Sequence, residues 1–141
     1  MTWIEQAFQF VAVASDVAML DEFAACGIEG PEDIRDLFVP RFYAGCEADD
    51  PMTSVAFNTD VNPMGVKIQA MLGSDISHWD VPDMVEVLPE AWEMVEGELL
   101  SEDDFADFAF NNVVRFYTEV NPAFFEGTRV ESDVAALATG R

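Results

Sequence analysis

Asp75 is the residue of this sequence whose position best suits chemistry. It follows an apolar, alternating segment at residues 66–72 that is typical of a β-strand. In barrels of parallel strands, side chains at the C-terminal strand ends point into the active site. A carboxylate there can bind a divalent metal or take a proton from a metal-bound water. A second interpretation is structural, because an aspartate at such a place often caps the following turn.

His78 and Trp79 lie in the same predicted loop as Asp75 and are candidates for positioning a substrate. His78 is the only histidine of the chain, and one imidazole cannot build a histidine-rich metal site. The alternatives are a histidine that is hydrogen-bonded within its loop and a tryptophan that serves in packing. The residue types leave both interpretations open.

An acidic stretch follows the first predicted strand, with carboxylates at Glu47, Asp49 and Asp50. If the two strands are parallel, these side chains face the same mouth as Asp75, because the C-terminal ends of parallel strands meet at one edge. An acidic loop surrounded by water is nevertheless the interpretation that these three residues favour.

Residues 58–62 carry the alternating oxygen donors of a calcium loop, at Asn58, Asp60 and Asn62. The glycine of such a loop comes two places late, at Gly65, and Gln69 stands where a glutamate normally closes the loop. An acidic calcium-buffering protein is therefore a third possibility that rests on this imperfect segment alone.

The elements that would position these residues alternate between helices and strands. Apolar spacing predicts helices at residues 3–26, 31–38, 84–96 and 101–120, and strands at 41–46 and 66–72. Ser101 with Asp104 resembles a capping box, and Asn121 with Pro122 ends the last of these helices. Alternation of this kind favours a parallel sheet. Two strands alone rarely form an independent sheet, so the pattern suggests that part of the fold is missing.

The length and composition indicate one folded domain spanning residues 1–141. Half of the residues are hydrophobic, with 12 Phe and 3 Trp, which is too apolar for a disordered chain. A chain of 141 residues can bury a real core. Residues 131–141 are expected to form a loosely ordered tail.

The charge excludes two classes of partner. The chain has 28 acidic and 6 basic residues and a formal net charge of -22. Such a surface repels phosphate backbones and anionic membranes, so neither nucleic acid nor a membrane is expected as a partner. High solubility and adaptation to a saline medium both explain the acidity, since salt screens the self-repulsion.

The cysteines and the N-terminus place the chain in the cytoplasm. Cys26 and Cys46 have no second pair beside them, so neither a zinc ribbon nor a disulfide framework is predicted, and two buried thiols are expected. No basic stretch precedes the apolar run at residues 8–20, and Asp16 interrupts that run. A secretion signal and a membrane span are therefore not predicted.

Two longer strings add a family resemblance. Residues 42–51 (FYAGCEADDP) and 73–84 (GSDISHWDVPDM) resemble the C-terminal part of metal-dependent amidohydrolase-related proteins. This is the branch that includes aminocarboxymuconate-semialdehyde decarboxylase-like enzymes. Residues 88–93 and 121–128 extend the similarity, which covers roughly residues 38–131. Ser77 stands where the family more often has glycine.

The resemblance implies an α/β fold, a partial (β/α)8 barrel built from about the last two β/α units and helix-rich C-terminal elements. Residues 41–46 would be the seventh strand and residues 66–74 the eighth. Asp75 would match the family's aspartate after strand eight, which ligates the metal or deprotonates the attacking water. The family's His-x-His pair and its further histidines are missing from this sequence, and a whole barrel needs about 250 residues.

The predicted function is that of the C-terminal portion of a metal-dependent amidohydrolase-like hydrolase or decarboxylase. The intact enzyme would use zinc or manganese, with Asp75 as ligand and base and with His78 and Trp79 against the substrate. Alone, the chain is expected to be inactive and to bind no metal, because such sites need three or more protein ligands. A small-molecule substrate would bind only if a missing N-terminal half completed the barrel.

The alternative function is a non-catalytic, self-associating acidic module derived from that barrel. An unclosed sheet exposes polar strand edges and an apolar face, and self-association covers both. A homo-oligomer is therefore the expected state.

Overall fold

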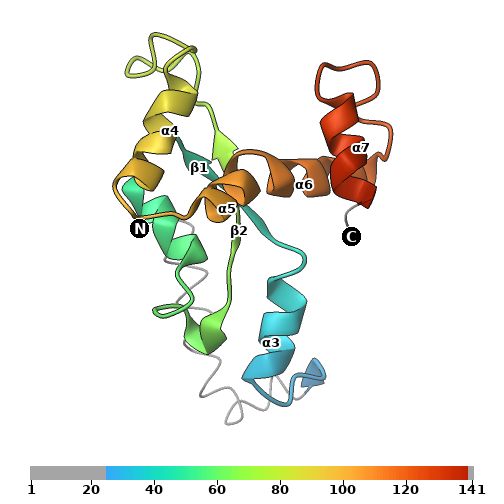
Figure 1. Ribbon diagram of the computed structural model, residues 1–141. Coiled ribbons are helices and arrows are strands. Elements are labelled where there is room, and N and C mark those ends of the chain that lie inside the picture. Colours follow the sequence, from blue (N-terminus) through green and yellow to red (C-terminus); the bar gives the residue numbers. More distant parts are fainter. Residues whose placement is uncertain (1–24, 140–141) are drawn as a thin grey trace.

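A pair of parallel strands forms the centre of the structure, a computed structural model that describes residues 25–139 (Figure 1). β1 (Tyr43–Glu47) pairs with β2 (Gln69–Gly73), and the register places Tyr43 beside Gln69 and Glu47 beside Gly73. Both strands and their parallel pairing confirm the sequence prediction. The C-terminal ends of the two strands meet at one edge, where the acidic loop and Asp75 follow.

The connection between the strands contains two short 3-10 helices. η2 (Pro51–Phe57) and η3 (Pro63–Gly65) each begin with a proline, whose fixed φ suits a first helical turn but not a helix interior. The Asp50 carboxylate accepts a hydrogen bond from the Met52 N–H at 2.9 Å and caps η2. No α-helix crosses between β1 and β2.

Helices before and after the sheet follow the predicted order. α3 (Pro31–Phe38) precedes β1 and matches its predicted bounds. α4 (Val87–Glu96), α5 (Glu102–Ala106), the π-helical segment η4 (Asp107–Asn111), α6 (Asn112–Val120) and α7 (Glu131–Thr139) follow β2. Of these, η4 and α6 pack against β2 (Figure 1). No residue of α7 is buried.

The predicted capping signal at the start of α5 is confirmed. The Ser101 hydroxyl accepts a hydrogen bond from the Asp104 N–H at 3.1 Å and donates one to the Asp104 carboxylate at 2.6 Å. Lys67 pairs with the same carboxylate and ties the segment before β2 to α5. Burial raises the pKa of Asp104, but the hydrogen bonds from Lys67 and Ser101 outweigh it and hold that pKa below its ordinary value.

The core lies between the sheet, η2 and the helices that follow β2. Phe108 and Ala70 are fully buried at its centre, and the Phe108 ring lies 6.4 Å from Phe57 and 6.5 Å from Phe105, centroid to centroid. The other buried members of this cluster are Ala48, Ala56, Ile68, Val87, Ala91, Met94 and Leu100. Residues from η2, β2, α4 and η4 therefore share one core.

The predicted partial (β/α)8 barrel is wrong. Residues 25–139 contain a two-stranded sheet, and the α-helical crossover of a β/α unit is replaced by η2 and η3. The Ala70 carbonyl accepts a hydrogen bond from the buried Asn112 amide at 2.9 Å, and the Ala70 N–H donates to the Ile68 carbonyl at 2.8 Å. The Asn112 side chain of α6 and the Ile68 carbonyl, just before β2, thus satisfy both backbone groups of Ala70, and no third strand is needed to pair them.

Two further predictions concern the N-terminal helix and membrane-spanning segments. The predicted helix at residues 3–26 lies almost wholly outside the described residues. Among the described helices, none has both the length and the apolar character that crossing a membrane requires.

Candidate metal centre

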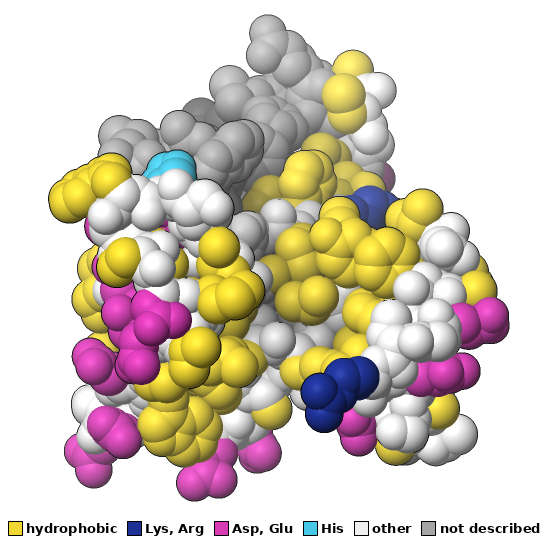
Figure 2. Space-filling model, turned by 90° about the horizontal axis from the view of Figure 1, so that it is seen from above, with side chains coloured by type: hydrophobic (Ala, Val, Ile, Leu, Met, Phe, Trp, Pro, Cys, Tyr) yellow, Lys and Arg dark blue, Asp and Glu magenta, His cyan; other side chains and the backbone are white. Residues whose placement is uncertain are grey.

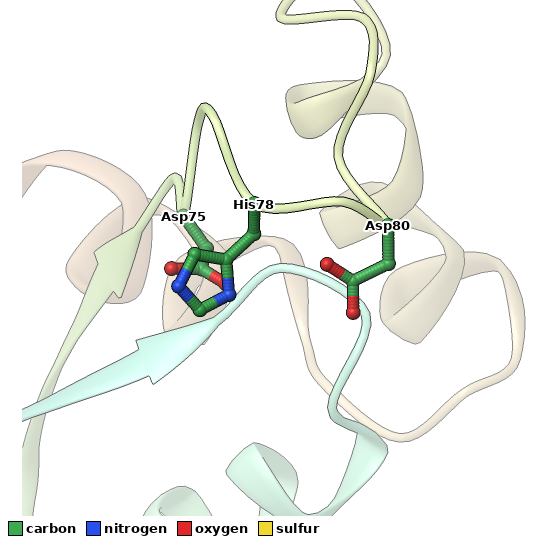
Figure 3. Close-up of side chains that lie close together, drawn as sticks. All are labelled: Asp75, His78 and Asp80. Carbon is green, nitrogen blue, oxygen red and sulfur yellow. The ribbon is translucent and has the colours of Figure 1, made fainter.

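Three side chains with metal-binding atoms converge in the loop between β2 and α4. One ligand atom each from Asp75, His78 and Asp80 lies within 4.8 Å of the others. His78 Nδ1 is 2.7 Å from Asp75 Oδ2, and the Asp80 carboxylate points toward this pair (Figure 3). Two carboxylates and an imidazole form a donor set that suits manganese and zinc.

Two tight turns bring these residues together. The His78 N–H donates to the Asp75 carbonyl at 3.1 Å, and the Val81 N–H donates to the His78 carbonyl at 3.2 Å. Asp75 has a φ of 47°, a left-handed conformation that aspartate tolerates better than most residues. Ser77 has a φ of 88°, a conformation that favours glycine, so the backbone is strained at this residue.

A small pocket lined by carboxylates adjoins the triad. Its acidic residues are Glu47, Asp49, Asp75, Asp80 and Glu90, and its volume is about 10 Å³. A cavity of this size holds one water molecule or one ion. It is far below the roughly 300 Å³ or more of a small-molecule site.

Glu47 and Asp49 of the first acidic loop are exposed, which agrees with the prediction of an acidic loop surrounded by water. Glu47 and Asp49 reach the same pocket as Asp75 because β1 and β2 are parallel and end together. Asp50 turns away to cap η2. The negative potential of several carboxylates at one edge attracts divalent cations.

His78 and Trp79 differ in their relation to this edge. The His78 side chain is 65% exposed, and the single histidine is visible on the surface in Figure 2 (cyan). His78 belongs to the triad through its ring nitrogens. Trp79 is 91% exposed and does not line the small pocket beside the triad.

The imperfect calcium loop has a structural role instead. The Asn58 side-chain oxygen accepts hydrogen bonds from the N–H groups of Asp60 and Val61, at 3.0 and 3.3 Å. The buried Asn62 amide donates to the carbonyls of Val55 and Val66, both at 2.9 Å. The Asn58 oxygen and the Asn62 amide nitrogen thus hold the turn before η3, whereas the buried Asn62 Oδ1 has no hydrogen-bond partner among the described residues.

The thiols contribute no ligand to the centre. Burial raises the pKa of the Cys46 thiol; a hydrogen bond with Thr53 opposes this, and the nearby Asp50 and Glu47 raise it further. A protonated thiol is a poor metal ligand and a poor nucleophile. Cys26 is exposed, so the prediction of two buried thiols is wrong for that residue.

The sequence interpretation did not name Asp80 as a site residue, and it gave His78 a substrate-positioning role and not that of a metal ligand. The signal for Asp80 was the spacing Asp75-x-x-His78-x-Asp80, in which two turns return the chain toward its starting point. Spacing of this kind is common in acidic loops, and only the turn geometry distinguishes a converging set from a dispersed one.

Comparison of the chain with protein-family models, curated protein sequences and solved structures gave no match. The resemblance to amidohydrolase-related proteins therefore stays a prediction.

Proposed function

We propose that this chain is a metal-binding module that holds a divalent ion, manganese or zinc, through Asp75, His78 and Asp80 and has no turnover by itself. The observation that carries this proposal is the convergence of three donor side chains within 4.8 Å. The neighbouring carboxylates of Glu47 and Asp49 add negative potential without closing the site.

The small pocket beside the triad suits an ion and not a substrate, although a hollow of about 370 Å³ shares Ala48, Asp49 and Glu90 with it. An ion fits a volume of about 10 Å³, but a substrate does not. Three protein ligands and open positions for water are the arrangement of catalytic zinc sites. Hydrolysis or decarboxylation, as in the amidohydrolase-related proteins, would thus require a second polypeptide that builds a substrate pocket over the ion. Asp75 would then act as ligand and base.

A titration of the metal-free chain tests the metal site. We expect one manganese or zinc ion per chain by calorimetry, and a thermal midpoint that rises with metal concentration because the ion binds the folded state. His78→Gln and Asp80→Asn should each weaken binding by about tenfold or more, since each removes one of three ligands.

Asp60→Asn is the matched control, because Asp60 is an exposed carboxylate outside the triad. It removes the same charge as Asp80→Asn and should leave the affinity nearly unchanged. Equal weakening by both substitutions would mean that the ion responds only to net charge, and the proposed site would be abandoned.

Self-association is a second candidate function, favoured by apolar side chains next to the metal loop. Trp79, Met84, Val85 and Leu88 are all more than half exposed. Apolar and acidic side chains share the face shown in Figure 2. Exposed apolar patches commonly mark protein interfaces.

Salt should strengthen this association, because each copy carries a formal charge of -22 and screening reduces the repulsion between copies. Sedimentation should show the mass of a dimer or larger assembly at high salt. Val85→Ser should restore a monomer there, whereas Val61→Ser, at a distant exposed valine, should not. A monomer under all salt conditions would refute this second function.

A further inference from the structure

A pocket between α6, the turn that follows it and α7 shares no residue with the metal centre (Figure 1). Its volume is about 370 Å³, and Val114, Phe125, Val134 and Leu137 are among its apolar walls. Small-molecule sites commonly have volumes of about 300 Å³ or more, mainly apolar walls and a few polar groups. This pocket therefore has the size and the lining of a ligand site, which the pocket of about 10 Å³ beside the triad lacks.

One face of α7 forms a wall of the pocket. Glu131, Val134, Ala135 and Ala138 line it, and residues at this spacing lie on one side of a helix. Val134 is half-buried, and no residue of α7 is fully buried. The apolar side chains on this face are therefore not packed into a core and can contact a ligand.

Arg115 is the basic residue that lines the pocket, and two neighbours hold its side chain in place. Its Nη1 donates a hydrogen bond to Asn112 Oδ1 at 2.9 Å and lies 3.3 Å from Asp107 Oδ1. Both contacts use Nη1, so among the described residues Nη2 and Nε have no hydrogen-bond partner. This edge of the guanidinium offers two parallel N–H donors, the geometry that matches a carboxylate.

Two carboxylates, those of Glu126 and Glu131, line the same pocket. Glu131 Oε2 accepts a hydrogen bond from the Gly127 N–H at 3.0 Å, which holds this side chain at the start of α7. In the described part of the chain, Arg115 pairs with Asp107 and with neither glutamate. The pocket thus presents a cationic and an anionic group that do not neutralise each other.

We propose that this pocket binds a free amino acid with an apolar side chain. The carboxylate of the ligand pairs with Arg115, its ammonium group pairs with Glu126 or Glu131, and its side chain lies against the apolar walls. The charge of the protein favours a zwitterion. A formal net charge of -22 repels a simple anion, and Arg115 repels a simple cation, whereas a zwitterion has no net charge.

Titration of the isotope-labelled full chain with L-leucine, followed by NMR in the presence of a chelator, tests this proposal. The chelator prevents leucine from binding through a metal ion at the triad. We expect saturable shift changes in the amides of residues 114–138. The compound 4-methylpentanoate lacks the ammonium group and 3-methylbutylamine lacks the carboxylate, so each should bind at least about tenfold more weakly than leucine.

Arg115→Gln should weaken leucine binding by about tenfold or more, because it removes the partner of the carboxylate. Arg129→Gln is the matched control, since it removes the same charge from an exposed residue that does not line the pocket. Glu126→Gln should weaken the binding of leucine without weakening that of 4-methylpentanoate, which has no ammonium group. Glu119→Gln, at an exposed residue outside the pocket, should change neither.

Three results would overturn the proposal. The first is the absence of saturable shift changes in residues 114–138 with leucine. The second is equal affinity for leucine and 4-methylpentanoate, because the ammonium group would then have no partner. The third is equal weakening by Arg115→Gln and Arg129→Gln, because binding would then follow net charge alone. Arg115 also contacts Asp107 and Asn112, so if Arg115→Gln lowers the unfolding midpoint, the comparison of Glu126→Gln with Glu119→Gln decides the question.

Discussion

Replacing Phe108 by alanine is expected to lower the free energy of unfolding by about 3–5 kcal/mol. Phe108 is fully buried and lies between β2 and the helices, with Phe57 and Phe105 against its ring. Alanine removes the apolar contacts and leaves a cavity that rigid neighbours cannot close. Because a domain of this size is stable by only about 5–15 kcal/mol, this one substitution would remove a large part of its stability.

Chemical denaturation followed by far-ultraviolet circular dichroism measures this loss. Phe124→Ala is the matched control, since it removes the same atoms from a side chain that is 46% exposed. Its effect should be well under half of that at Phe108. If the two substitutions cost the same, Phe108 does not occupy the centre of the core.

The second large effect is expected for Asn62→Asp, which replaces the side-chain NH2 group by an oxygen and leaves the side-chain volume almost unchanged. The buried Asn62 amide nitrogen donates to the carbonyls of Val55, Ala56 and Val66. Aspartate would aim a carboxylate oxygen at those acceptors, and the expected cost is about 3 kcal/mol at neutral pH. The turn before η3, and with it the approach to β2, would be destabilised.

The destabilisation by Asn62→Asp should depend on pH in a definite direction. Burial and the facing carbonyls would raise the pKa of the new carboxyl in the folded state above its value of about 3.9 in the unfolded chain. The variant is then closest to the parent below about pH 4 and loses stability as pH rises through the folded-state pKa. Unfolding midpoints of both proteins across this range measure the difference.

Asn58→Asp is the control for this prediction. The Asn58 side chain acts as an acceptor, from Asp60 and Val61, and is exposed. Aspartate keeps that acceptor, so its cost should be small at every pH. A pH-independent loss in Asn62→Asp would contradict the buried-donor explanation.

The sequence determined several local elements correctly because their causes lie within a few residues of one another. Pro31 starts α3, the Ser101 hydroxyl caps α5, and the chain leaves α6 at Asn121. Alternation of apolar residues gave β2, although the observed strand starts at Gln69, later than predicted. The π-helical segment η4 has no comparable local signal.

The fold class could not be predicted from local signals of this kind. The alternation of helices and strands favoured a parallel sheet, and the family resemblance implied a barrel, but whether further strands follow depends on what covers the outer edge of β2. In this chain the Asn112 side chain, 42 residues later in the sequence, donates a hydrogen bond to the Ala70 carbonyl. A long-range hydrogen bond of this kind leaves no periodic pattern in the sequence.

The candidate metal centre was likewise predictable from the sequence only in part. The sequence by itself indicated Asp75 as a metal ligand after a strand, because residue type and strand length are local properties, and it named His78 only as a candidate for positioning a substrate. Only the tertiary structure decided that Asp80 turns back toward them and that Glu47, Asp49 and Glu90 surround one ion-sized pocket. Convergence depends on strand register, turn dihedrals and helix packing acting together, and each of these is fixed by contacts between segments that are distant along the chain.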